Sequence, residues 1–134
     1  NLVTACPICQ QCVFLEMVGK LEVGGGTIIY MPEMTQNQIN AMCHVLFCAI
    51  TTSHTYMNKA HEIMNSLKLR SQYVEKNFGE HMSKPSMLGQ MIVDTPYKDM
   101  HNKKSAILKD LRLLPNLDDF SILIQDWIKH AGTF

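Results

Sequence analysis

Residues 35–50 read TQNQINAMCHVLFCAI and carry the strongest helix signal in the chain. Thr35 and Gln38 have the T-x-x-Q spacing of a capping box, in which each side chain satisfies a backbone N–H group at the start of a helix. Apolar side chains then recur at intervals of one helical turn, at Ile39, Met42, Cys43, Leu46, Phe47 and Ile50. The sequence therefore predicts a helix over residues 35–51 whose second half is buried on several sides.

The segments before this helix predict another helix and a short strand. Pro7 suits the first turn of a helix because the N–H group that proline lacks has no partner there. We expect that helix to end near Gly24. The β-branched and aromatic run TIIYM at 27–31, bounded by glycines and Pro32, predicts a strand.

The segments after the helix alternate between helical and strand-like patterns. Residues 56–78 read mainly as helix, although the alternation within 67–73 also fits a strand and leaves that segment open. MLGQMIVDT at 87–95 predicts a strand, which Pro96 ends before a further helix. FSILIQDWI at 120–128 has the clearest period-two alternation and predicts a strand with one apolar face. This order indicates an α+β domain of the ferredoxin-like or split βαβ type.

The bulk composition describes an ordinary globular chain. Its 134 residues are 46% hydrophobic and 18% charged, which predicts one domain with a real core. The first residue is Asn1, so we expect residues 1–134 to be a fragment of a longer protein. No apolar run is long enough to span a membrane, and we expect no membrane partner. Five cysteines, an odd number, favour free thiols in a reducing compartment.

The charges are unevenly distributed although the net charge is zero. Residues 59–112 contain ten Lys or Arg against six Asp or Glu, whereas the two flanking segments are each net negative. A positive segment of this kind faces either a polyanion or only solvent along a helix. The sequence leaves both interpretations open.

Three cysteines near the N-terminus have the spacing of a metal site. Cys6, Cys9 and Cys12 form C-x2-C-x2-C, but a ferredoxin-type cluster needs a further cysteine at the position of Glu16. On a helix the three thiols would drift around the surface, so we interpret them as packing residues. Cys43, Cys48, His54 and His61 are spaced too closely for a zinc finger. We predict neither a metal nor a cofactor.

Catalytic motifs do not stand out either. The chain has no G-x-S-x-G, P-loop, H-E-x-x-H or G-x-G-x-x-G sequence. A cysteine and a histidine that pair only in space would leave no such sequence signal, so that possibility stays open. We expect a protein that is not an enzyme.

A family resemblance rests on GGGTIIYMPEMTQNQINAMCHVLFCAITTSHTYM, on QMIVDTP and on FSILIQDWIKHAGTF. These stretches resemble the C-terminal domain of the immediate-early 2 transactivators of betaherpesviruses, in particular the roseolovirus branch. The resemblance implies a viral transcription regulator in the host nucleus that binds promoter DNA, activates viral and cellular promoters and represses its own. It also implies a homodimer whose strands close a β-barrel, similar to the DNA-binding domains of gammaherpesvirus nuclear antigens.

Site residues follow from that resemblance and from the charge pattern. The basic side chains expected to contact the DNA backbone are Lys98, Lys103, Lys104 and Arg112. The polar side chains expected to approach the bases are Gln36, Asn37, Asn40 and His44. The dimer interface is expected to contain Phe120, Ile122, Leu123, Ile124 and Trp127. The alternative is a protein-interaction module that recruits host general transcription factors without contacting DNA.

Overall fold

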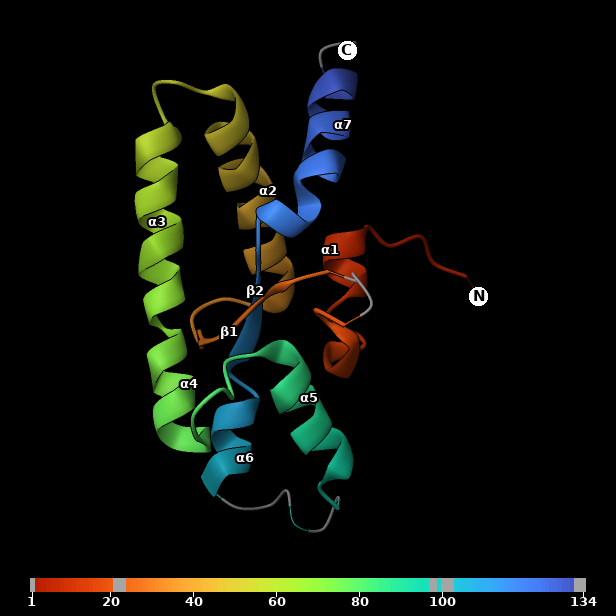
Figure 1. The fold of residues 1–134 in the computed structure, drawn as a ribbon, viewed down its shortest axis with the longest axis vertical. Helices are drawn as coiled ribbons and strands as arrows, with labels where there is room; N and C mark the ends of the chain where they lie inside the picture. The colour runs from red at the N-terminus through yellow and green to blue at the C-terminus, as the bar shows by residue number, and fades with distance from the viewer. Residues whose placement is uncertain (1, 21–23, 97–98, 100–102, 132–134) are drawn as a thin grey trace.

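The computed structural model describes residues 2–20, 24–96, 99 and 103–131, with only the backbone of Lys103 and Lys104 (Figure 1). Helices make up most of the described chain. The elements in chain order are α1 (Pro7–Gln10), the 3-10 helix η1 (Leu15–Met17), β1 (Gly26–Tyr30), α2 (Gln36–Thr52), α3 (Met57–Leu69), α4 (Ser71–Phe78), α5 (Pro85–Asp94), α6 (Lys103–Leu108), β2 (Leu111–Pro115), the 3-10 helix η3 (Asp118–Phe120) and α7 (Ser121–Ala131).

The two strands form an antiparallel ribbon in the middle of the molecule. Gly26 pairs with Pro115 at one end of the ribbon, and Tyr30 pairs with Leu111 at the other. Successive residues of a strand point to opposite faces, yet Ile28 and Ile29 are both almost fully buried. Both faces of the ribbon are therefore covered, by α2, α3 and α7 toward one end of the molecule and by α4 and α5 toward the other (Figure 1).

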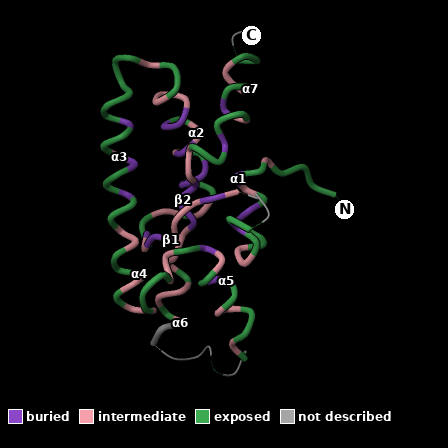
Figure 2. Tube along the Cα trace, viewed as in Figure 1, coloured by how far each residue is buried: buried purple, intermediate pink, exposed green. Residues whose placement is uncertain are grey.

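We call the larger set of buried side chains the α2 core. It joins α2, α3 and α7 to one face of the ribbon, and Figure 2 shows buried residues along α2 and beside the strands. Its members are Ile8, Ile29, Met31, Ile39, Cys43, Leu46, Phe47, Ala60, Met64, Leu67, Leu114, Phe120 and Ile124.

We call the smaller set the α5 core. It lies on the opposite face of the ribbon, between α4, α5 and the segment that follows α1, and its buried members are Val18, Ile28, Val74, Leu88 and Leu113. Leu113 and Leu114 are consecutive on β2 and belong to different cores. Because successive side chains of β2 point to opposite faces, its apolar residues are divided between the α2 core and the α5 core.

The helix predicted over 35–51 is confirmed as α2. Thr35 Oγ1 accepts a hydrogen bond from the backbone N–H of Gln38 at 3.2 Å, and Gln38 Oε1 accepts one from the backbone N–H of Thr35 at 2.9 Å. The capping box is therefore complete. The stripe predicted to be buried does face the α2 core, where Ile39, Cys43 and Phe47 have no exposed surface.

The predicted strand at 27–31 and the predicted helix over 56–78 are also found. The strand is β1, and the helix is present as α3 and α4, which meet at Arg70. The segment 67–73 is therefore helical. The Arg70 guanidinium donates to the Tyr30 carbonyl at 3.2 Å and to the Glu33 carboxylate at 2.9 Å, which fastens the α3–α4 junction to the end of β1.

The long N-terminal helix was predicted wrongly. α1 ends at Gln10, and η1 follows after a turn in which Phe14 has φ −120° and ψ 64°, outside the helical region. Cys6 at the start of α1 provides no side-chain cap, so little local stabilisation supports a longer helix.

The strand predicted at 87–95 was wrong as well, because this segment belongs to α5. Pro85 occupies the first turn, and Leu88, Met91 and Ile92 recur at helical spacing on the α5 core. Gly89 is buried against η1, where a Cβ atom would overlap the backbone of Glu16. This glycine lets the two elements approach closely.

The strand predicted at 120–128 is helical too, since Phe120 belongs to η3 and the following residues to α7. Phe120 and Ile124 are one helical turn apart and both enter the α2 core, so the alternating pattern was compatible with a helix. The second strand is instead β2, which lies in the segment after Pro96 where only a helix was expected. The helix expected after Pro96 is found in part, as α6.

These differences overturn the ferredoxin-like, barrel-forming architecture. The described residues contain a single sheet of two strands, β1 and β2, and it does not close on itself. A dimeric β-barrel of the gammaherpesvirus nuclear antigen type needs four strands from each subunit, so that expectation was wrong. Within the described part of the chain, each helix is too short or too polar to cross a membrane.

Candidate functional site

The polar start of α2 meets α1 and β2, and Gln36 makes the central contacts there. Its Nε2 donates to the Leu113 carbonyl at 2.7 Å, and its Oε1 accepts from the Leu113 N–H at 2.8 Å. The side chain therefore pairs with the strand as a backbone peptide group would, and it covers part of the free edge of β2. Gln36 also donates to Asn40 Oδ1 at 3.0 Å.

Asn40 extends the hydrogen bonds of Gln36 to the N-terminal cysteines. The side chain is buried, and Nδ2 lies 3.5 Å from Cys9 Sγ and 3.8 Å from Cys12 Sγ. A buried amide is costly unless it is paired, and here the thiols are its partners. Asn40 therefore holds the segment after α1 against α2.

The three N-terminal thiols lie around this side of α2. Burial, followed by a hydrogen bond with the Cys6 side chain, raises the pKa of Cys9, and burial raises the pKa of Cys12. Raised pKa values keep a thiol protonated and make it a poor nucleophile. No three His, Cys, Asp or Glu side chains among the described residues lie close enough together to hold a metal ion.

His44 lies one turn beyond Asn40 on the same face of α2. Its ring is 4.3 Å from the Trp127 ring of α7, measured between centroids, and its Nε2 is 3.9 Å from Cys6 Sγ. Burial lowers the pKa of His44. The neutral imidazole ring on α2 therefore contacts both Cys6 at the start of α1 and Trp127 of α7.

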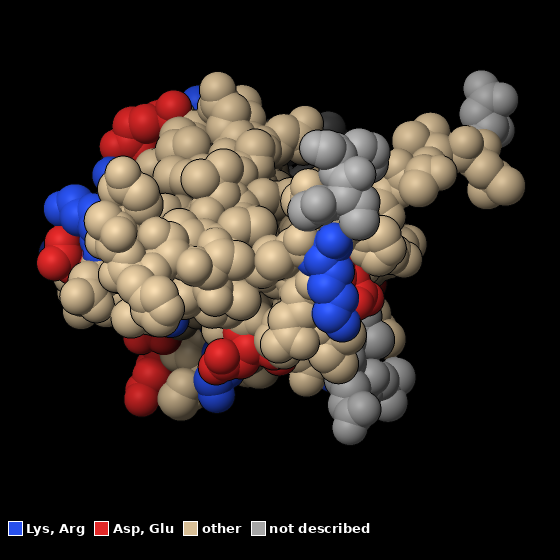
Figure 3. Space-filling model, turned by 90° about the horizontal axis from the view of Figure 1, so that it is seen from above, with Lys and Arg blue, Asp and Glu red and all other residues tan. Residues whose placement is uncertain are grey.

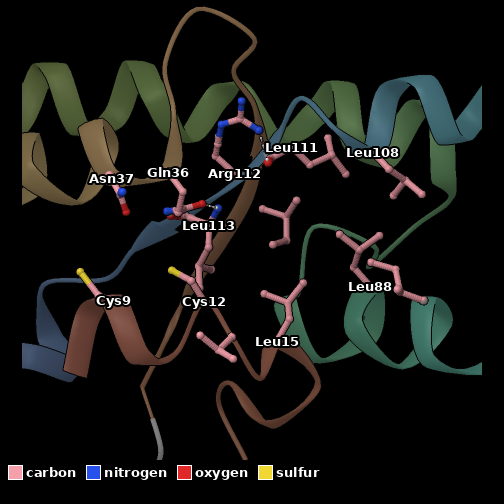
Figure 4. Close-up of a pocket in the computed structure, with 13 residues that line it drawn as sticks. Cys9, Cys12, Leu15, Gln36, Asn37, Leu88, Leu108, Leu111, Arg112 and Leu113 are labelled. Atoms are coloured by element: carbon pink, nitrogen blue, oxygen red, sulfur yellow. Dashed lines mark hydrogen bonds between the residues drawn. The ribbon is translucent and has the colours of Figure 1, made fainter. Parts of the chain in front are cut away.

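A cavity of about 410 Å³ opens beside these polar residues (Figure 4). Its polar end is lined by Cys9, Cys12, Gln36, Asn37 and Arg112, and its apolar end mainly by Leu15, Leu88, Leu108 and Leu111. The walls come from the segment after α1, from α2, α5 and α6, and from β2. The cavity therefore adjoins the α5 core.

Arg112 is fixed by the protein's own backbone. Its guanidinium group donates to the carbonyls of Met34 at 2.6 Å, Lys109 at 2.7 Å and Leu111 at 2.8 Å. The other basic residues expected at a phosphate surface are not placed beside it: Lys98 lies outside the described residues, as do the side chains of Lys103 and Lys104.

The four polar residues expected to face DNA divide into two groups. Asn37 is exposed at the rim of the cavity. Gln36, Asn40 and His44 instead bind β2, α1 and α7, as described above. The sequence singled out the polar strip of α2 but gave no sign that its partners lie inside the same chain.

The residues expected at a dimer interface are mostly turned inward. Phe120 and Ile124 are buried in the α2 core, and Leu123 and Trp127 pack against it. Ile122 is exposed. A face that already packs within its own chain has little apolar area left for a partner.

The surface around the end at which α7 lies is largely uncharged (Figure 3). Lys and Arg side chains on this face alternate with Asp and Glu around the edges of a broad uncharged area. This arrangement lacks the continuous positive field that attracts a nucleic acid backbone.

The comparisons with known proteins give a bacterial relative. No protein-family model matches the chain. The chain is 46% identical over 131 residues to the type 4 apparatus protein DotN of Legionella pneumophila, and the match covers 98% of the chain. The matched region spans 61% of the length of that relative.

This similarity overturns the herpesvirus resemblance. The quoted stretches agreed with the viral family only at scattered positions, whereas the bacterial match runs through nearly the whole chain. The expected function as a viral transcription regulator and the location in the host nucleus were therefore wrong. The expected partners, double-stranded DNA, a second copy and host general transcription factors, came from the same resemblance and are withdrawn with it.

Proposed function

We propose that this chain is a component of a bacterial type 4 secretion apparatus, at the bacterial envelope, and that it acts by binding other proteins of that apparatus. The identity of 46% over 98% of the chain to a type 4 apparatus protein is the observation that carries the proposal. Identity at this level over a whole chain accompanies a shared fold, and the shared component role is the step we propose.

The described surface supports a role in protein binding. Large apolar side chains are exposed on the segment around α1 and η1, where Val13, Phe14 and Met17 lie close together in sequence. A group of exposed apolar side chains marks an interaction surface more often than a single one does. The cavity of about 410 Å³ lies next to this segment and is lined in part by Val13.

We also propose that this chain is not an enzyme. Cys6 and His44 are the pair that most resembles catalytic machinery, since Sγ and Nε2 are 3.9 Å apart, the length of a weak hydrogen bond to sulfur. The imidazole ring is packed on Trp127. We interpret the pair as a contact between α1 and α2.

A chimera tests the proposed function directly. The 131 matched residues of DotN would be replaced by this chain in a Legionella strain that lacks its own copy, and assembly would be followed by co-purification of apparatus proteins. We expect the chimera to restore assembly. A chimera that is present and folded but recovers no apparatus protein would contradict the proposal.

A matched variant separates binding from catalysis in the same strain. Cys6→Ser within the chimera removes the thiol and changes little else. We expect this variant to assemble like the unaltered chimera. Loss of apparatus function with assembly intact would show that the thiol has a chemical role.

A further inference from the structure

The C-x2-C-x2-C motif begins with two cysteines that lie side by side at the start of α1. Cys6 is the N-cap residue of this helix, and Cys9 is its third residue. The side chains at these two positions reach each other in a capping box, and here the Cys6 and Cys9 thiols share a hydrogen bond. Both thiols are free and partly exposed. They therefore form a pair that a small molecule can reach.

Cys12 is the other near neighbour of Cys9 in the motif, but its thiol is engaged elsewhere. Its Sγ donates to the Ile8 carbonyl at 3.5 Å. A disulfide joins two sulfur atoms about 2 Å apart, so the pair already in contact needs the smallest movement. The bond expected on oxidation is therefore Cys6–Cys9, which closes a C-x-x-C sequence typical of redox-active pairs.

A proton acceptor lies beside Cys6. Nε2 of His44 is 3.9 Å from Cys6 Sγ, and burial lowers the pKa of this imidazole. The ring is therefore neutral near pH 7, and one of its nitrogen atoms has a lone pair that can take a proton. Burial raises the pKa of Cys9, which keeps that thiol protonated. Because the thiolate is the nucleophile in disulfide exchange, Cys6 is the cysteine of the pair that attacks first.

We propose that Cys6 and Cys9 are a redox-active pair whose substrate is a low-molecular-weight disulfide such as glutathione disulfide. His44 takes the thiol proton of Cys6, and the thiolate attacks one sulfur atom of the small disulfide. The S–S bond of the small disulfide breaks, one thiolate leaves, and a mixed disulfide forms on Cys6. The Cys9 thiol then loses its proton to water, attacks Sγ of Cys6 and expels the second thiolate. The cysteine pair loses two electrons and two protons, and the small disulfide gains them and becomes two thiols.

The new bond would be easy to reverse. It closes a loop of only four residues, which constrains the unfolded chain much less than a long loop does. A partly exposed disulfide that adds little stability is readily reduced by free thiols. Oxidation also removes the Cys6 proton from the contact with His44, so the junction of α1 and α2 differs between the two redox states. This site goes beyond the proposed function and does not depend on it.

Peptide mapping of the full chain tests the site. The reduced protein would be incubated with glutathione disulfide, its remaining thiols would be blocked with N-ethylmaleimide in urea, and the peptides would be identified by mass spectrometry. We expect a disulfide that joins Cys6 to Cys9, with Cys12, Cys43 and Cys48 blocked by the reagent. Dithiothreitol should restore all five thiols.

Cys9→Ser is the decisive variant, and Cys48→Ser is its matched control. Without Cys9 the reaction should stop at the mixed disulfide, so Cys6 should carry a stable glutathione adduct. Cys48 is a partly exposed thiol on α2, and Cys48→Ser should form the Cys6–Cys9 bond as the unaltered chain does. A Cys9→Ser protein whose Cys6 stays free would contradict the order of attack and overturn the proposal.

His44→Phe tests the proton acceptor. Its Cys6 thiol should react with glutathione disulfide about tenfold more slowly near pH 7, which is less than a well-aligned base contributes because the contact is long. Near pH 9.5 the solvent ionises most thiols without help, so the variant and the unaltered chain should react at similar rates. Equal slowing at both pH values would show that His44 only shapes α1, and it would contradict the role as acceptor.

The map of the unaltered chain decides the proposal even if a variant does not fold. A disulfide between another pair, such as Cys9 and Cys12, would overturn it. A folded chain whose Cys6 and Cys9 thiols both stay free in excess glutathione disulfide would overturn it as well. Protection of Cys6 from the blocking reagent without a bond to Cys9 or to glutathione would have the same meaning, since another group would then occupy the thiol.

Discussion

The two faces of the β1–β2 ribbon are covered by hydrophobic cores of different size. Among the described residues, the α2 core contains thirteen buried side chains, whereas the α5 core contains five and adjoins the cavity of about 410 Å³. The large α2 core stabilises the ribbon from one face. The opposite face can therefore be covered by shorter helices while the ribbon stays ordered. The difference indicates that the α2 core provides most of the stability and that the α5 side has more room to change.

Removal of the largest buried side chain of the α2 core gives the strongest test of this comparison. Phe47 has no exposed surface, and Phe47→Ala should lower the free energy of unfolding by about 3–5 kcal/mol, because it leaves a cavity where the neighbours are close-packed. Urea denaturation followed by circular dichroism would measure the change. Phe14→Ala removes an exposed ring and serves as the control, with little expected change.

The corresponding change in the α5 core should cost less. Leu88 is almost fully buried on the wall of the cavity, and Leu88→Ala should cost about 2–3 kcal/mol, at the lower end of the usual range for such a change. Met87→Ala, on the exposed side of the same helix, is the control. A loss as large as that of Phe47→Ala would break the comparison, because it would make the two cores equally important.

Gly89→Ala tests how closely α5 and η1 are packed. Alanine normally favours a helix over glycine by about 1 kcal/mol, but here the added Cβ atom would overlap the backbone of Glu16. We expect a net destabilisation of about 1–2 kcal/mol, since overpacking costs more than helix propensity returns. Gln90→Ala on the same helix is the control, and a stabilised Gly89→Ala protein would show that η1 moves freely.

The smallest expected effect is the pH dependence conferred by His44. Its pKa is lowered in the folded state, so the unfolded chain binds a proton more readily as the pH falls through about 6.5. The stabilising effect of the neutral ring is complete above that pH and is lost on acidification, which works against folding. Denaturation midpoints between pH 7.5 and 5.5 should fall less in His44→Phe than in the unaltered chain.

A greater sensitivity of His44→Phe to acid would contradict this account. The neighbouring side chains that contact His44 are Cys6 and Trp127. The variant removes the imidazole ring and leaves these neighbours in place. The expected difference would place a pH-sensitive contact on the α2 side of the molecule and sharpen the contrast with the α5 side.

The sequence predicted α2 better than it predicted α5 and α7. α2 has a capping box and a stripe over several turns, and both signals lie within one segment. The windows 87–95 and 120–128 are so short that their apolar residues satisfy a strand period and a helix period together. β2 was missed because its partner β1 lies far away in the chain, and only pairing identifies a strand that includes Arg112.

The candidate site residues show the same limit of prediction from sequence. The polar strip of α2 was visible in the sequence, and its residues do gather at one place, but their partners became known only from the structure. Gln10 and Gln11 are identical in type and adjacent in sequence, yet Gln10 is exposed, whereas Gln11 is buried and its Nε2 has no hydrogen-bond partner among the described residues. No local pattern distinguishes them, since the Gln11 side chain contacts Gly24 and Gly25, which come later in the chain.

The ribbon also governs when the chain can fold during its synthesis. β1 has no strand partner until residues 111–115 exist, and each core needs a residue of β2, Leu114 in one case and Leu113 in the other. Chains grow at about 5–20 residues per second, so β1 and α2 wait several seconds for their final neighbour. During that interval the apolar stripe of α2 is incompletely covered, and nascent chains stopped before β2 should be the ones that chaperones hold.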